Sequence, residues 1–194
     1  MTKKFPGTLF LVVGNSGSGK DSIIFEIVKK FPPYLKNIYA PKRYITRAPS
    51  KFEENISISP QEFRDMDKKE MFALKWHIYS LDYGISKEIE DYLKQGHPVI
   101  INVSRMVVKI ARDKYENVNV IFIDVPFEIT YQRIKDRKRE SEDLLKQRIE
   151  RARNNPEFPD ADFVIDNSGD LENAVDALLN YMLKIIDENK KEEN

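Results

Sequence analysis

Short apolar runs and amphipathic segments alternate along most of the chain. Three continuous runs rich in Leu, Val and Ile are typical of strands buried on both faces, at residues 8–13, 99–103 and 118–125. Helical patterns lie between and after these runs, at residues 21–31, 87–95, 105–115 and 127–138. A fourth short strand at 163–165 precedes a final amphipathic helix whose apolar stripe runs from Leu171 to Ile185. Strands that alternate with helices predict an α/β fold with a parallel sheet and crossover helices.

Two stretches interrupt this alternation and are expected to be functional insertions. The first covers residues 38–86 and contains β-like pieces and a short helix, which begins with the capping box Ser59-Pro60-Gln61-Glu62. The second covers residues 133–153 and carries nine Lys/Arg against five Asp/Glu. That local excess of positive charge indicates an anion site or a mobile lid, or else only a solvated pair of helices. No linker or internal repeat divides the chain, so a single domain is expected.

Composition excludes several classes of protein. The chain has 194 residues, of which 41% are hydrophobic, and its 32 Lys+Arg balance 32 Asp+Glu. A chain of this size and composition forms a core, so fibrous and disordered classes fit poorly. Zero net charge predicts neither nucleic acid nor a membrane as a partner, and any anion site must be local. There is no cysteine, no apolar run near 18 residues and no signal-type start, and these features predict a cytoplasmic protein without disulfides.

A glycine-rich segment stands between the first buried strand and the first helix. It reads Gly14-Asn15-Ser16-Gly17-Ser18-Gly19-Lys20 and holds three of the seven glycines. Glycine lets successive backbone N–H groups point at phosphate oxygens, and the helix N-terminus adds its positive end. The lysine reaches the β- and γ-phosphates. Strand, loop, lysine and helix in this order predict a phosphate-binding loop for ATP, in preference to a glycine-rich turn without function.

The residue after the lysine is unusual for such a loop. Ser or Thr normally stands there and holds magnesium, whereas this chain has Asp21, with a hydroxyl only at Ser22. Carboxylate and hydroxyl oxygens both suit Mg²⁺, so either residue is a candidate metal ligand. Asn102 lies in the strand at 99–103, where an acidic residue is common in nucleotide-binding folds. Either the metal-binding carboxylate has moved from that strand to Asp21, or Asn102 only hydrogen-bonds a loop.

Candidate residues for a second anionic substrate lie in the first insertion. Arg43 and Arg47 stand four residues apart at its head, and arginine holds phosphate bidentately. Two solvated arginines are the plainer alternative. Tyr83, next to Gly84, would add a phenolic donor, although such a tyrosine is more often a core or rim aromatic.

The second insertion supplies arginines suited to phosphoryl transfer. This reaction needs positive charge on the oxygens of the moving group, and it needs water excluded. Arg137 and Arg148 flank the polar stretch at 140–143 and are the predicted pair, whereas Arg133 and Arg151 equally suit structural roles. His77 and His97 stand alone and are expected to be packed or exposed rather than catalytic. A phosphate acceptor is already an anion, so no general base is needed.

Together these motifs resemble the guanylate-kinase-like P-loop kinases, and within them the ribose 1,5-bisphosphate phosphokinases of phosphonate breakdown, the PhnN family. The resemblance covers nearly the whole chain in family order. It is carried by these segments: the phosphate loop through Asp21-Ser22, Arg43-Tyr44-Ile45-Thr46-Arg47, Phe72-Ala73-Leu74-Lys75-Trp76-His77, Tyr83-Gly84, residues 99–105 and the lid to Ala152. The resemblance implies an α/β P-loop three-layer sandwich with a parallel central sheet, an acceptor-binding insertion and a lid. The expected division is a core of 1–37, 97–132 and 154–194, an insertion of 38–86 and a lid of 133–153.

The residues that read guanine in guanylate kinases are replaced in this chain. Guanylate kinases use a glutamate before the tryptophan and a threonine after Tyr-Gly, where this sequence has Lys75 and Ile85. Asn55 stands where they have a tyrosine that holds the GMP phosphate. A lysine cannot accept hydrogen bonds from guanine, and isoleucine has no polar side-chain atom. Losses of this kind discriminate by about 10⁴ or more, so GMP is expected to be a poor acceptor.

The resemblance implies transfer of the ATP γ-phosphoryl group to ribose 1,5-bisphosphate, which gives 5-phosphoribosyl 1-diphosphate (PRPP). In this interpretation Lys20 and the loop residues 14–22 bind ATP with Mg²⁺, and Lys75 joins Arg43, Arg47 and Tyr83 on the acceptor. Arg137 and Arg148 would stabilise the moving group. A nucleoside-monophosphate kinase is the alternative enzyme, and a phospho-ligand binding module is the alternative without catalysis. The partner is expected to be a small sugar phosphate, and the protein a monomer or a homodimer.

Overall fold

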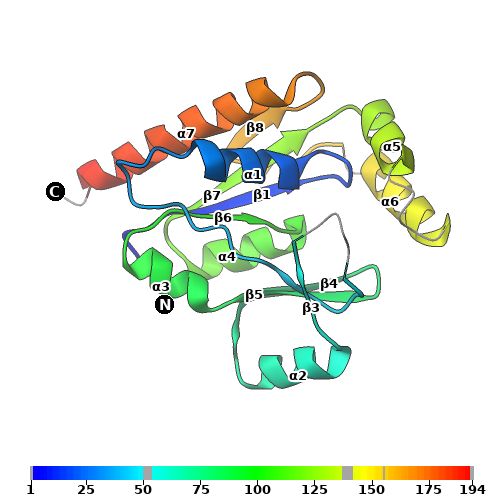
Figure 1. Cartoon of the computed structure of the whole chain (residues 1–194), viewed down its shortest axis with the longest axis horizontal. Helices are drawn as coiled ribbons and strands as arrows, with labels where there is room; N and C mark the ends of the chain where they lie inside the picture. Colours follow the sequence, from blue (N-terminus) through cyan, green and yellow to red (C-terminus); the bar gives the residue numbers. More distant parts are fainter. Residues whose placement is uncertain (1, 50–53, 137–141, 155, 193–194) are drawn as a thin grey trace. The chain divides into compact units, whose positions relative to one another are not determined.

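The computed structural model describes residues 2–49, 54–136, 142–154 and 156–192. Helices and strands alternate along the chain, as Figure 1 shows. The chain forms two compact units. The first unit comprises Met1–Phe10 and Pro32–Val118, and the second comprises Leu11–Phe31 and Asn119–Asn194. Two of the three boundaries between the units lie inside strands, β1 (Leu9–Gly14) and β7 (Val118–Asp124), and the third lies between Phe31 and Pro32. The expected division into core, insertion and lid stays a prediction.

The central sheet is the one predicted from the apolar runs. Its strand order is β6-β1-β7-β8, where β6 is Val99–Asn102 and β8 is Phe163–Asp166. β7 and β8 pair in parallel, in a register from Ile121 opposite Phe163 to Asp124 opposite Asp166. The apolar residues of β1 and β6 are almost completely shielded from solvent. Continuous apolar sequence therefore marks these strands because both of their faces are covered.

In the second unit, α1 (Lys20–Lys30) lies beside α7 (Leu171–Glu192), as Figure 1 shows. Lys30 contacts Glu172 and Asp176 across this pair. Both helices bury an apolar stripe, as expected of amphipathic helices. α5 (Phe127–Asp136) is followed by α6 (Glu142–Asn154). The helix expected at 127–138 is confirmed up to Asp136, and its last two positions lie outside the described residues.

The first unit contains a second sheet with the strand order β3-β2-β5-β4. Its strands are β2 (Tyr44–Ile45), β3 (Ile56–Ser57), β4 (Phe72–Ile78) and β5 (Leu81–Ser86). α2 (Pro60–Lys68) packs on this sheet through Phe63, whose ring stacks on Phe72 at a centroid distance of 4.6 Å. The predicted capping box is confirmed. The Ser59 hydroxyl accepts from the Glu62 N–H at 3.1 Å, and the Glu62 carboxylate accepts from the Ser59 N–H at 2.7 Å.

The remaining helices of the first unit are α3 (Glu88–Lys94), the 3₁₀ turn η1 (Arg105–Val107) and α4 (Val108–Lys114). A single helix was expected at 105–115, but its first turn is 3₁₀. Ser104 caps that turn, because its hydroxyl accepts from the Met106 N–H at 3.4 Å. Ser104 competes for the first amides and thereby tightens that turn.

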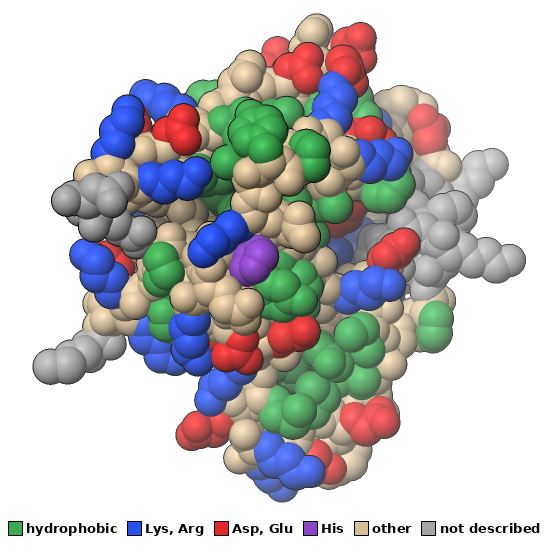
Figure 2. All heavy atoms as spheres, turned by 60° about the vertical axis from the view of Figure 1, so that its left-hand side comes forward, with side chains coloured by type: hydrophobic (Ala, Val, Ile, Leu, Met, Phe, Trp, Pro, Cys, Tyr) green, Lys and Arg blue, Asp and Glu red, His purple; other side chains and the backbone are tan. Residues whose placement is uncertain are grey.

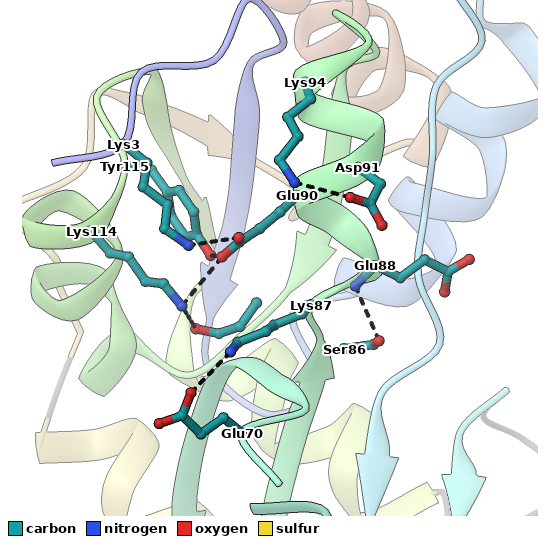
Figure 3. Close-up of polar contacts among 11 residues, drawn as sticks. Lys3, Glu70, Ser86, Lys87, Glu88, Glu90, Asp91, Lys94, Lys114 and Tyr115 are labelled. Carbon is teal, nitrogen blue, oxygen red and sulfur yellow. Dashed lines mark hydrogen bonds and ion pairs between the residues drawn. The ribbon is translucent and has the colours of Figure 1, made fainter.

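A buried carboxylate ties several elements of the first unit together (Figure 3). Glu90 of α3 is only 7% exposed, and it accepts from the Lys3 ammonium at 2.6 Å and the Tyr115 hydroxyl at 2.7 Å. The Lys114 ammonium lies 3.4 Å away and also donates to the Ala73 carbonyl of β4 at 2.9 Å. Glu90 therefore connects the N-terminal segment, α3 and the end of α4, and Lys114 extends this network to β4.

Charged side chains of both signs are interspersed on the face shown in Figure 2. Such a surface is expected of a chain with zero formal net charge. Within the described ranges, none of the helices has the length and apolar character needed to span a membrane.

Candidate functional site: a phosphate loop and an arginine-bearing sheet

The predicted phosphate loop connects β1 to α1. β1 ends at Gly14 and α1 begins at Lys20, one residue before the predicted helix start, because Gly19 in left-handed geometry serves as the N-cap. The Lys20 ammonium donates to the carbonyls of Gly14 at 2.9 Å and Asn15 at 2.8 Å, and to the Ser18 hydroxyl at 3.2 Å. Lys20 therefore holds its positive charge on the loop itself, next to the N-terminus of α1, where an anion is favoured.

Two loop glycines are required by their backbone geometry and by close neighbours. Gly17 has φ +81° and Gly19 has φ +88°. A Cβ atom at Gly17 would lie 2.9 Å from the Thr130 carbonyl oxygen, and one at Gly19 would lie 2.4 Å from the Asn167 side-chain nitrogen. Any other residue at these positions would be strained and would also clash. The loop shape thus depends on α5 and on the segment after β8.

The candidate metal ligands lie in the first turn of α1. Asp21 and Ser22 are both exposed there, immediately after Lys20. Both offer oxygen, the ligand atom that Mg²⁺ prefers, and a metal bound with a nucleotide takes further oxygens from the phosphates. The described residues contain no cluster of three metal-binding side chains. The oxygens of Asp21 and Ser22 therefore fit a Mg²⁺ ion that is bound together with a nucleotide. Asn102 is the buried last residue of β6, in the first unit.

Arg43 and Arg47 flank strand β2 in the first unit, and both are half-buried. The Arg43 Nε donates to the Asn55 side-chain oxygen at 3.2 Å. This contact follows from the parallel pairing of β2 with β3, in which Tyr44 stands opposite Ile56, so the residues that precede them also meet. Next to Arg47, the Thr46 hydroxyl accepts from the Asp82 N–H at 2.8 Å. Both arginines are thus attached to a hydrogen-bonded sheet.

The structure does not bring Lys75 and Tyr83 together. In the antiparallel pair of β4 and β5, Lys75 stands opposite Gly84 and Trp76 stands opposite Tyr83. Because side chains alternate along a strand, Lys75 and Tyr83 lie on opposite faces of this ribbon. Tyr83 is buried and stacks on Trp76 at a centroid distance of 5.1 Å, whereas Lys75 is exposed and pairs with Asp67 of α2. The two residues cannot line one small site from the same face.

The arginines of the basic segment differ in their surroundings. Arg148 and Arg151 lie on α6 and are half-buried. Arg133 of α5 donates to the Asn167 backbone carbonyl at 3.1 Å. Arg137, the other member of the predicted catalytic pair, lies outside the described residues. Arg133 thus has a structural contact, and the catalytic roles of Arg137 and Arg148 stay predictions.

Both histidines belong to the first unit and have partners near them. The His77 Nδ1 lies 2.7 Å from the Asp82 carboxylate on the second sheet. The His97 Nδ1 lies 2.8 Å from the Asn37 carbonyl, and its ring meets Tyr92 edge-on. Both rings thus have local partners, and the expectation that neither is catalytic stays a prediction.

Comparison with known proteins assigns the family. The sequence profile of the guanylate kinases matches residues 7–185, a stretch that includes the phosphate loop, the second sheet and α6. The chain belongs to the guanylate kinase family. A solved guanylate kinase from Anaplasma phagocytophilum has the same fold, with a TM-score of 0.67 at 19% identity, and the match covers 93% of this chain and 87% of that one. The predicted α/β P-loop fold is therefore confirmed.

Curated relatives place the chain within one group of the guanylate kinase family. A "Ribose 1,5-bisphosphate phosphokinase PhnN" from Bradyrhizobium diazoefficiens is 36% identical over 147 residues, which cover 76% of this chain and 74% of the relative. A protein of the same name from Pseudomonas paraeruginosa is 33% identical over 181 residues, which cover 91% and 95%. The chain belongs to the PhnN group, as its motifs indicated.

Several contacts of this guanylate-kinase-family site were missed from the sequence. Asn167 donates its side-chain amide to the Ser18 carbonyl of the phosphate loop at 2.7 Å. The Asn15 side chain donates to the Ala152 carbonyl of α6 at 3.4 Å. The Asp67 carboxylate accepts hydrogen bonds from the Lys75 ammonium group. The first two contacts join residues 149 and 137 positions apart, whereas Asp67 and Lys75 are eight positions apart. No local motif signals any of these pairs.

Proposed function

We propose that this protein transfers the γ-phosphoryl group of ATP to the 1-phosphate of ribose 1,5-bisphosphate, giving ADP and PRPP. The choice of acceptor rests on the side chains at the two positions that bind the guanine base in guanylate kinases. Ile85 is fully buried, and the ammonium of Lys75 is engaged by Asp67. Neither group can accept hydrogen bonds from a guanine base. The names of the PhnN relatives support the same acceptor.

The reaction requires one bond to form and one to break. An oxygen of the acceptor 1-phosphate attacks the γ-phosphorus, and the bond from that phosphorus to the β,γ-bridging oxygen breaks, so ADP leaves with its electron pair. The attacking oxygen is already anionic, and no protein base has to take a proton. The chain therefore has to position two phosphates, neutralise charge and exclude water.

Different residues carry out these tasks. Lys20 and the amides of loop residues 14–22 hold the donor phosphates, while Arg43, Arg47 and Tyr83 hold the acceptor. Mg²⁺, with Asp21 or Ser22 among its ligands, supplies further positive charge to the donor phosphates when it is bound. Arg148, together with Arg137, stabilises the charge that spreads over the moving group. Lys75 stays a predicted acceptor ligand that would first have to leave Asp67.

The test is ADP release from Mg·ATP with ribose 1,5-bisphosphate, compared with GMP and the other nucleoside monophosphates at equal concentration. Lys20→Ala, purified in the same way, measures the background from contaminating kinases. We expect the sugar bisphosphate to be preferred over GMP by about 10⁴ in kcat/KM. Preference for a nucleotide would show a nucleoside-monophosphate kinase instead. ATP binding without turnover on any acceptor would favour a phospho-ligand binding module.

A further inference from the structure

The segment after β8 reaches the phosphate loop through one buried side chain. Asn167 is only 3% exposed, and its amide nitrogen donates to the Ser18 carbonyl at 2.7 Å. These residues are 149 positions apart in the chain, and both belong to the second unit. A buried side-chain amide bonded to the main chain of the phosphate loop fixes the orientation of one peptide group there.

Asn167 is itself held on both sides. Its backbone N–H donates to the Asp124 carbonyl at the end of β7, at 2.9 Å. Its backbone carbonyl accepts from the Arg133 guanidinium of α5, at 3.1 Å. These contacts attach Asn167 to the central sheet and to α5, so the direction of its side chain follows from the fold. The loop carbonyl therefore meets a donor that is already in place.

The direction of the Ser18 carbonyl sets that of the next amide. The described peptide bonds are trans, and in a trans peptide the C=O and N–H groups point in opposite directions. The N–H of Gly19 consequently points away from Asn167. The Gly19 carbonyl, on the following peptide, accepts from the Ile23 N–H of α1 at 3.0 Å. The peptide groups on both sides of Gly19 are thus anchored, although a glycine backbone by itself rotates easily.

We propose that Asn167 is a positioning residue for the donor: it holds the Ser18–Gly19 peptide so that the Gly19 N–H donates to a donor phosphate. This inference rests on the proposed function, since it takes the loop as the triphosphate site. It also explains why residue 19 is a glycine, because a Cβ atom there would lie only 2.4 Å from the Asn167 side-chain nitrogen. An amide aimed in advance avoids the cost of turning the peptide when phosphate binds.

The experiment compares two ligands that share the phosphates but not the base. Binding of ATP and of inorganic tripolyphosphate, both with Mg²⁺, is measured by calorimetry for the wild type and Asn167→Ala. We expect both ligands to bind roughly tenfold or more weakly to the variant, by the same factor, because one charge-assisted hydrogen bond is lost. Asn119→Ala is the matched control. The Asn119 side-chain oxygen accepts from the Tyr181 hydroxyl at 2.9 Å in the same unit, so this variant also loses one asparagine hydrogen bond. We expect it to bind both ligands as the wild type does.

Each other outcome overturns the inference. Unchanged affinities with lower thermal stability would show a purely structural asparagine. Weaker binding of ATP alone would show that Asn167 acts on the base. If the wild type binds neither ligand, the proposed function fails as well. Should Asn167→Ala not fold, the wild-type protein labelled with ¹⁵N-glycine decides: the Gly19 amide signal must shift when Mg-tripolyphosphate is added, and a signal that stays in place overturns the inference.

Discussion

The ammonium group of Lys75 lies 2.6 Å from both carboxylate oxygens of Asp67, on the face of the β4–β5 ribbon opposite to Tyr83. This pairing joins β4 to α2. Both side chains are substantially exposed, at 54% and 37%, so solvent weakens the attraction between them. The lysine that replaces the guanine-reading glutamate therefore has a partner within the fold, and the acceptor is not needed to explain its charge.

Replacement of Lys75 by alanine tests which partner matters. If Asp67 is the partner in the working enzyme, Lys75→Ala changes the KM for ribose 1,5-bisphosphate by less than about threefold, and lowers stability by under about 1 kcal/mol. Steady-state kinetics and urea denaturation measure the two effects. Asp67→Asn is the companion variant, since it frees Lys75. A tenfold rise in KM for Lys75→Ala, with a fall for Asp67→Asn, would instead place Lys75 on the acceptor.

Lys20→Ala should remove activity and leave the fold intact. The ammonium is the charged group of the phosphate loop that contacts the Gly14 and Asn15 carbonyls, and its loss leaves developing charge on the phosphates uncompensated. We expect kcat/KM to fall by about 10³. Lys29→Ala, in the same helix but paired with Glu26 at 2.9 Å, should retain full activity. Normal turnover by Lys20→Ala would rule out the loop as the donor site.

Asp21→Ser should change the metal dependence more than the choice of acceptor. In the proposed function, Asp21 is a candidate ligand of Mg²⁺, so the loss of its carboxylate is expected to weaken the binding of that ion. We expect the Mg²⁺ concentration for half-maximal activity to rise on the order of tenfold. Ser22→Ala is tested in parallel by the same titration. A shift confined to Ser22→Ala would assign the metal to the hydroxyl and remove Asp21 from the site.

Arg148→Ala should slow the chemical step. We expect kcat to fall by about 10², with little change in the KM for ATP, because the guanidinium acts on charge that develops during transfer. Arg153→Ala is the control on the same helix. Its guanidinium lies 5.1 Å from the centre of the Phe127 ring, and its loss should cost at most about 1 kcal/mol of stability without lowering kcat. Equal kcat for both variants and the wild type would show that Arg148 has no role in transfer.

Glu90 should make the stability of the protein depend on pH. Although burial disfavours its charged form, hydrogen bonds from Lys3 and Tyr115 and the charge of Lys114 lower the pKa of the carboxyl below its ordinary value. Burial and the bond to Glu90 raise the pKa of Tyr115, which therefore remains a donor. Because the folded-state pKa lies below the unfolded one, the carboxylate stabilises the fold above the unfolded value of 4.5. That contribution is lost as the pH falls through the folded pKa.

Glu90→Gln should lower the free energy of unfolding at pH 7 by about 2 kcal/mol, since it leaves buried donors poorly matched. The difference from the wild type should shrink as the pH falls below 4.5 and through the lower folded-state pKa, because the wild-type carboxylate then gains a proton. Denaturation at each pH measures this. Asp91→Asn, on the exposed side of the same helix, should show neither effect. If the free energies of unfolding of the two proteins differ by the same amount at every pH, the charge of Glu90 does not contribute to stability.

The sequence by itself determined the fold class, the order of strands and helices outside the two insertions, the phosphate loop and the capping box of α2. Each of these depends on residues close together in the chain. Apolar runs mark the buried strands, glycines before Lys20 mark the loop, and Ser59 with Glu62 caps a helix from within four residues. Local interactions of this kind produce sequence patterns that can be recognised without a structure.

Only the tertiary structure decided which side chains meet. The sequence suggested that Lys75 and Tyr83 serve one site, but the register of β4 and β5 separates them onto opposite faces. The contact of Asn167 with Ser18 spans 149 positions, and that of Glu90 with Lys3 spans 87. Such pairs form because packed elements bring distant residues together. A single sequence specifies the elements, but the partner of each polar side chain depends on how they pack.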